Sequence, residues 1–150
     1  MSTLSRRLAT MKALVHSCSA ISTHPGAYST ICSEFDDTAK ARDSSPEARR
    51  LLLQVLHSTR ALDTALKVFV RFHSITVRKP SLGGYLHALT THSLAHLRQL
   101  PQTRRDDFQN TIVRPRNKYL HEAGTNPSNH HEILSLLSEM QVCLIEVLNL

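Results

Sequence analysis

Residues 129–149 read NHHEILSLLSEMQVCLIEVLN, and this stretch decides the fold class. Apolar side chains recur every three or four positions, which places them along one face of an α-helix. Asn129 precedes the run and Glu132 lies three residues later, the spacing of a capping box at a helix start. The apolar face consists of Ile133, Leu136, Leu137, Met140, Leu144, Val147 and Leu148. The stretch therefore predicts a helix that buries one broad face.

The composition of the whole chain extends this prediction. Hydrophobic residues make up 41% of the 150 residues, glycine occurs only four times, and tryptophan is absent. Strand-like alternation is rare, whereas Leu, Ala, Arg and Glu are plentiful, which favours helices. A chain of this length fits one domain, residues 1–150. We therefore expect an all-α protein with a single helical domain.

Turn signals divide the remainder into further helical segments. Five are predicted, near residues 3–20, 29–41, 46–73, 81–100 and 103–123. With the final helix they form an up-down bundle of five to six helices. Ser45 is the expected N-cap of the third segment, with Pro46 in its first turn. Gly83 and Gly84 either admit a neighbouring backbone or weaken the first turn of the fourth segment.

The fifth segment contains Pro115, which removes a backbone donor and disfavours helix at the preceding residue. Either this helix kinks there, or a fresh helix begins with Pro115 in its first turn. Gly124 is a suitable C′ residue after the helix. The segment is the penultimate long helix of the predicted bundle.

Charge indicates the class of partner. The net charge is +6 and the pI is about 9.7, which suits RNA or DNA first and anionic membranes second. The alternative is a mildly basic surface that only aids solubility. No run approaches the ~18 apolar residues of a membrane span, so no membrane partner is expected.

Cysteine usage and the amino-terminal stretch bear on location. The three cysteines, Cys18, Cys32 and Cys143, are far apart and odd in number, and they fit no disulfide or metal pattern. A reducing, cytoplasmic location is therefore expected. Residues 1–33 contain no acidic residue and are rich in serine, as in a mitochondrial transit peptide. The same residues also fit an ordinary helix of the bundle.

Residues 113–124, VRPRNKYLHEAG, combine a guanidinium, an amide and an imidazole on one helix. At 100° per residue, Arg116 falls inside the apolar arc of the helix and Asn117 lies at its edge. His121 is about 140° round from Arg116, so the two side chains do not stack directly. A buried guanidinium needs either an internal carboxylate or an anion in a cleft. Possible internal carboxylates are Asp36, Asp37 and Asp63.

These residue types suit RNA cleavage without a metal or cofactor. His121 titrates near neutral pH and can act as general base or acid. The planar guanidinium of Arg116 can stabilise charge that develops on a phosphate, and the amide of Asn117 can orient the ring or the ribose. Arg114 and Lys118 are expected to bind the RNA backbone. Since one histidine supplies one proton-transfer group, two copies facing each other in a dimer would supply both.

Residues 116–121, RNKYLH, resemble the R-N-x3-H form of the motif of the HEPN superfamily. Members are small α-helical bundles, and many are metal-independent endoribonucleases of toxin–antitoxin, abortive-infection and CRISPR defence systems. Their motif lies on a late helix that a loop and a final helix follow, as in this chain. The resemblance implies a homodimer with the motif at its interface, catalytic roles for Arg116 and His121, and a supporting role for Asn117. It also implies an antitoxin or sensor partner.

Two other interpretations stay open. One is a non-catalytic helical module that binds nucleic acid or a nucleotide, or that scaffolds a partner, with Arg116 buried against a carboxylate. The other concerns metal: His92 and His96 have the i, i+4 spacing of a two-histidine metal face, with His130 or His131 as a third ligand. No cysteine or carboxylate pattern accompanies them, so no metal site is assigned. One of the histidines His87, His92 and His96 would line an RNA cleft if the bundle brings it near His121.

Overall fold

Helices account for all the regular secondary structure of the computed structural model, which describes residues 1–150. The α-helices are α1 (Thr3–Ser17), α2 (Ser19–Ser22), α3 (Ala27–Lys40), α4 (Glu47–Phe72), α5 (Leu82–Thr91), α6 (Gln102–Phe108), α7 (Arg114–His121) and α8 (His130–Leu148). A 3₁₀ turn, Ala41–Asp43, follows α3, and a π-helical turn, Gln109–Val113, joins α6 to α7. The all-α prediction is confirmed.

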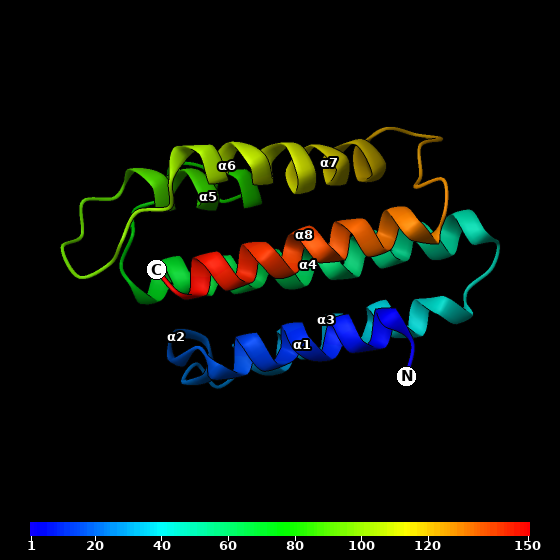
Figure 1. Cartoon of the computed structure of the whole chain (residues 1–150), viewed down its shortest axis with the longest axis horizontal. Coiled ribbons are helices and arrows are strands. Elements are labelled where there is room, and N and C mark those ends of the chain that lie inside the picture. Colours follow the sequence, from blue (N-terminus) through cyan, green and yellow to red (C-terminus); the bar gives the residue numbers. More distant parts are fainter.

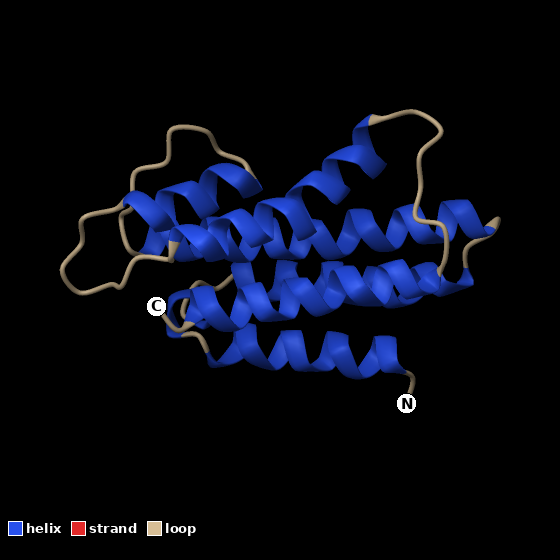
Figure 2. Ribbon diagram, turned by 45° about the horizontal axis from the view of Figure 1, so that its top comes forward, coloured by secondary structure: helices blue, strands red, loops and turns tan.

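The helices lie in layers, and consecutive long helices alternate in direction (Figure 1). Helices α1 and α3 form one outer layer, α4 and α8 the middle, and α5, α6 and α7 the other outer layer. Figure 2 shows the same arrangement tilted, with the α6–α7 rod rising away from the central pair. The up-down bundle is confirmed, and α7 belongs to the last long rod before α8. None of the helices combines the length and the apolar content that crossing a membrane requires.

The core runs through all layers as one cluster of 36 buried residues. Helix α8 contributes the predicted face, with Leu137, Met140 and Leu144 fully buried and Leu148 half-buried. Its N-cap is also as predicted, because the Asn129 side chain accepts the N–H of Glu132 at 3.1 Å. Helix α1 packs into the same core through Leu4, Leu8, Met11 and Val15, so the acid-free stretch supplies an ordinary helix of the bundle.

The prediction of a helix over 81–100 is wrong beyond Thr91. At His92 the backbone becomes extended (ψ 157°), and a loop runs from there to Pro101. The His92 ring Nε2 lies 3.1 Å from the Arg98 carbonyl oxygen, and the N–H of Leu100 donates to the Leu89 carbonyl at 2.9 Å. Leu97 and Leu100 are buried, as the apolar period required, but they reach the core from a loop.

Other boundaries shift by a few residues. Helix α4 begins at Glu47 with Pro46 itself as the N-cap, so the assignment of Ser45 to that position is wrong. The segment 3–20 breaks at Cys18, whose extended backbone separates α1 from α2. Gly124 takes the left-handed conformation (φ +78°) but lies two residues beyond the C-cap Glu122, in a turn closed by the N–H of Thr125.

A fresh α-helix begins next to Pro115, which is one of the two predicted outcomes. Proline lacks the N–H that would continue the α-helical ladder. The preceding turn widens instead, and the N–H of Arg114 donates to the carbonyl of Gln109, five residues back. Helix α7 then begins at Arg114 with Pro115 in its first turn, and the rod continues in nearly the same direction (Figure 1).

Candidate nucleic-acid interface

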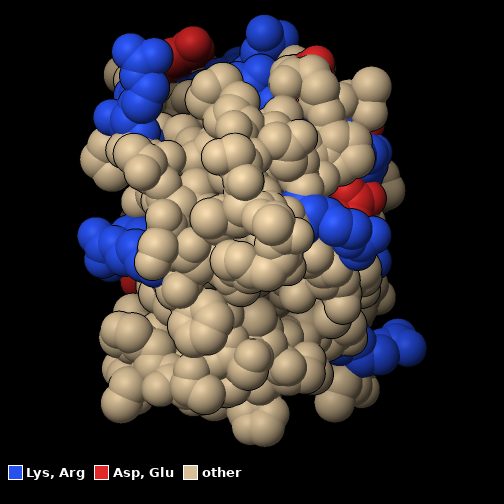
Figure 3. All heavy atoms as spheres, turned by 90° about the vertical axis from the view of Figure 1, so that its left-hand side faces the viewer, with Lys and Arg blue, Asp and Glu red and all other residues tan.

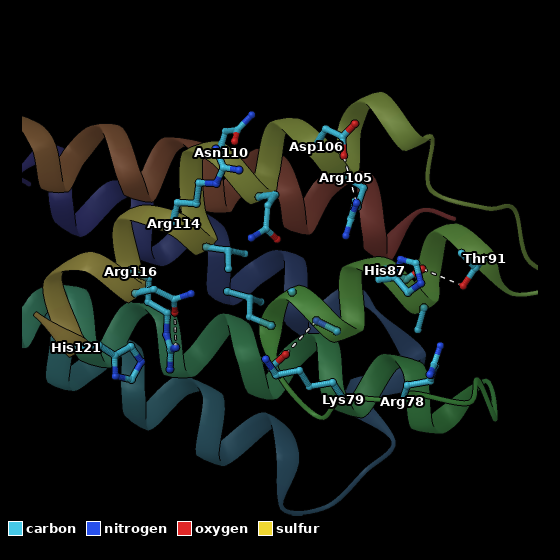
Figure 4. Close-up of a pocket in the computed structure, with 18 of the residues that line it drawn as sticks. Arg78, Lys79, His87, Thr91, Arg105, Asp106, Asn110, Arg114, Arg116 and His121 are labelled. Carbon is cyan, nitrogen blue, oxygen red and sulfur yellow. Dashed lines mark hydrogen bonds and ion pairs between the residues drawn. The ribbon is translucent and has the colours of Figure 1, made fainter.

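A cleft of about 1200 Å³ opens between α5 with its preceding loop and the rod of α6 and α7 (Figure 4). Five cationic side chains line the cleft but only one acid, Asp106. The cations are Arg78, Lys79, Arg105, Arg114 and Arg116. By contrast, few Lys, Arg, Asp or Glu side chains are seen at the centre of the end of the bundle in Figure 3. Such a cleft attracts polyanions.

The cleft brings together four of the five residues assigned from the sequence. Arg114, Arg116, Asn117 and His121 line it, whereas Lys118 does not. Arg116 and His121 meet the same cleft although they lie about 140° apart on an ideal helix. Arg116 is half-buried and His121 is exposed, and both side chains line the cleft.

No carboxylate holds the guanidinium of Arg116. Its Nη1 donates to Oδ1 of the neighbouring Asn117 at 3.1 Å, and its Nε is buried without a hydrogen-bond partner. Of the proposed internal partners, Asp36 pairs with Lys12 and Asp37 with Lys40. The guanidinium therefore keeps donors that an anion in the cleft can use.

Asp63, the third proposed partner, influences Arg116 only through its charge. No ion pair or side-chain hydrogen bond involves Asp63. Burial raises the pKa of this carboxyl, and the nearby charges of Arg116 and Lys67 oppose that rise. The half-buried carboxylate of Asp63 thus favours the cation of Arg116 by its charge without occupying the guanidinium donors.

The imidazole of His121 is exposed at the last residue of α7 and makes no hydrogen bond within the chain. A second histidine, His87, lines the cleft from α5. The two rings lie toward opposite ends of the cleft in Figure 4. His87 therefore lines the cleft without lying beside His121.

The wall opposite the motif depends on Gly84. A Cβ at this position would lie 1.8 Å from the carbonyl oxygen of Lys79, so only glycine lets the loop pack this closely on α5. Ser81 caps α5 by accepting the N–H of Gly84 at 3.1 Å. The close approach predicted for the glycine pair is confirmed at Gly84, and it places Arg78 and Lys79 along the cleft.

Arg78, Lys79 and Arg105 were not assigned as site residues from the sequence. Arg78 and Lys79 occupy an ordinary loop pattern before Pro80, and Arg105 lies in a run of mixed charges. The only sequence signal for this wall was the Gly83–Gly84 pair, which marked a close backbone approach without saying what approaches.

The alternative of a two-histidine metal face is not supported, because α5 ends before His92 and the two histidines do not share a helix. His96 instead approaches His73, with ring nitrogens 3.4 Å apart. Elsewhere, Glu34, Asp37 and His57 have donor atoms within 4.8 Å of one another. Glu34 already bonds His57 at 2.8 Å and Arg60 at 3.0 Å, so this cluster acts as an ion-pair network between α3 and α4.

Comparisons with protein-family models, curated proteins and solved structures find no match to this chain. The function is therefore argued from the cleft and its residues.

Proposed function

We propose that this protein is a metal-independent endoribonuclease of the HEPN type. The observation that supports this most directly is the presence of Arg116, Asn117 and His121 in one cationic cleft. The cleft supplies a phosphate clamp, a proton-transfer group and a field that attracts RNA. Helix α7 also precedes a loop and the final helix, the layout that the motif resemblance implies.

The proposed reaction begins when His121 takes the proton of a ribose 2′-hydroxyl. The 2′-oxygen then forms a bond to the adjacent phosphorus, and the bond from phosphorus to the 5′-oxygen breaks. That oxygen leaves with a proton from a general acid, which yields a 2′,3′-cyclic phosphate and a 5′-hydroxyl. Arg116 neutralises the charge that builds on the phosphate oxygens, and Asn117 orients Arg116 through its Oδ1.

A homodimer would supply the second proton-transfer group. Within one chain, His87 lies toward the other end of the cleft from His121 (Figure 4). Helix α7 has no fully buried residue, and Tyr119 and Leu120 are only half-buried. This partly covered helix is the surface through which we propose that two copies meet, so that the second His121 acts on the same phosphate.

The cellular role that we propose is the one that the resemblance to the HEPN motif implies. An RNA-cutting enzyme harms its own cell unless it is restrained, so we propose a cytoplasmic toxin or anti-phage effector that an antitoxin or sensor protein controls. Arg114 lines the cleft and would contact the RNA backbone there. Lys118 lies outside the cleft, so we propose that it contacts RNA only beyond the cleft rim.

The second candidate is a protein that binds nucleic acid or a nucleotide without cutting it. One observation favours it: the His121 ring has no hydrogen-bond partner within the chain that would orient it for proton transfer. The cationic cleft alone would suffice for binding.

The test is cleavage of a fluorescently labelled RNA in excess EDTA by the wild type, His121→Ala and Arg116→Ala. We expect the wild type to cut and each variant to lose about 100-fold or more of the rate. His131→Ala and Arg6→Ala are matched controls, because both residues are exposed and lie outside the cleft. They should cut as the wild type does, with products that carry a cyclic phosphate.

Binding without cleavage by the wild type would favour the second candidate. Cleavage that EDTA abolishes, or that survives both cleft substitutions, would contradict the proposed enzyme. Sedimentation of the wild type would check the dimer separately.

A further inference from the structure

The cleft extends well beyond the residues of the motif. Figure 4 shows Arg116 and His121 toward one end and Arg78 toward the other, with Lys79 between them on the same loop as Arg78. Neither Arg78 nor Lys79 takes part in an ion pair, and both side chains are exposed. Two unpaired cations thus lie at a distance from the proposed reaction centre.

The backbone that carries these cations is held in place on both sides. Before them, Ile75 is buried and its N–H donates to the carbonyl of Val70 at 2.9 Å. After them, the Lys79 carbonyl accepts the N–H of Ser81 at 2.8 Å and rests against Gly84. A fixed backbone keeps two positive charges beside the cleft, so little ordering is required when a ligand binds.

The cations on the α6–α7 side of the cleft are less free to bind a phosphate at this distal position. Arg105 lines the cleft from α6, but its Nη1 is 3.3 Å from Oδ1 of Asp106, which offsets part of its charge. Arg114 is unpaired, yet in Figure 4 it lies toward the Arg116 end. Arg78 and Lys79 are therefore the principal unpaired cations of the cleft away from the motif.

We propose that Arg78 and Lys79 form a distal phosphate subsite that binds RNA backbone away from the bond to be cut. The inference rests on the proposed function for the identity of the ligand as RNA. Its consequence is a substrate class: an oligonucleotide whose backbone follows the cleft from the Arg116 end to the loop. A dinucleotide has a single internucleotide phosphate, so one that is bound at Arg116 has no second backbone phosphate for the distal subsite.

The experiment measures binding without requiring catalysis. The probes are fluorescein-labelled 2′-O-methyl uridine oligomers of ten and two nucleotides, which lack the attacking hydroxyl. Anisotropy titrations compare the wild type with the double variant Arg78→Ala/Lys79→Ala over a range of KCl concentrations. The matched control is Arg6→Ala/Arg49→Ala, which removes two exposed, unpaired cations outside the cleft.

We expect the cleft double variant to bind the ten-nucleotide probe about tenfold more weakly at ~0.1 M salt. The slope of log affinity against log salt should fall in magnitude by about 1.4, since each contact to a single strand contributes about 0.7. Binding of the two-nucleotide probe should not change, and the control double variant should behave as the wild type. Thermal unfolding midpoints of both double variants verify that the fold is intact.

Equal weakening by the cleft and control variants would overturn the distal subsite, because it would indicate general charge attraction. Unchanged binding of the longer probe by the cleft variant would overturn it as well. If the contrast holds but the wild type fails to cut unmodified RNA, the nuclease proposal fails while the distal subsite stands.

Discussion

Helices α7 and α8 are consecutive in the chain, yet they differ in what their side chains do. Helix α8 buries seven residues in the core, whereas α7 buries none completely. Helix α7 instead carries Arg114, Arg116 and Lys118 and ends at His121. The difference teaches that α8 chiefly stabilises the core, whereas α7 chiefly lines the cationic cleft.

This division has a physical cause. Apolar burial stabilises a helix wherever it packs, but an unpaired guanidinium is tolerated only where water or an anion can reach it. The cations of α7 therefore require an open cleft beside them. Changes in α8 should alter stability, and changes in α7 should alter chemistry.

The largest effect on stability should come from Leu137→Ala in the fully buried face of α8. The lost burial and the resulting cavity should cost about 2–5 kcal/mol of the free energy of unfolding. Urea unfolding measures this cost. Leu120→Ala on α7 is the matched change at a half-buried site and should cost less than half as much. Equal costs would break the contrast between the two helices.

A smaller effect should follow from Gly84→Ala. The new methyl group would overlap the Lys79 carbonyl, so the loop must move, at a cost of about 1–3 kcal/mol. The displaced loop should also weaken binding of the ten-nucleotide probe, since Arg78 and Lys79 move with it. Calorimetry and anisotropy measure the two effects.

Gly26→Ala is the control for this substitution, because no group other than its two chain neighbours lies within 4 Å of the added methyl position. It should leave both stability and binding close to those of the wild type. A Gly84→Ala protein with the stability and the probe binding of the wild type would indicate that the close packing of the loop on α5 is not required for binding in the cleft.

The smallest effect concerns Glu132, which joins the two helices under comparison. Its carboxylate accepts the backbone N–H of Ser128 at 2.9 Å and the Tyr119 hydroxyl at 3.1 Å. The backbone bond to Ser128, followed by the Tyr119 bond, lowers the pKa of Glu132. Its stabilisation is therefore present above the ordinary carboxyl pKa and is lost as pH falls through the lowered value.

Glu132→Gln should cost about 0.5–1 kcal/mol near pH 7, and the difference from the wild type should shrink in acid. Urea unfolding at several pH values measures this. Glu122→Gln, at an exposed carboxylate with no ion pair, should show no such trend. A difference that grows in acid would have the wrong sign and would contradict the role of the carboxylate.

Some features followed from local sequence patterns because their causes are local. The α8 stripe and the Asn129 cap were predicted correctly, since helical period and capping act within a few residues. The prediction of a helix through residue 100 was wrong, because Leu97 and Leu100 lie in a loop and are nevertheless buried. The spacing of apolar residues indicates which side chains are buried, but here it did not indicate the backbone conformation.

The sequence by itself determined an all-helical chain, its apolar faces, its excess of positive charge and the RNKYLH motif. The net charge depends on composition alone, and the other three depend on residues that are close together in the chain. Only the tertiary structure decided that Arg78 and Lys79 share a cleft with Arg116 and His121. That arrangement depends on how α4, α5 and α7 pack, and the Lys79 backbone reaches its place only because Gly84 has no side chain. Contacts between distant segments arise from packing of the whole bundle, which no short stretch of sequence encodes.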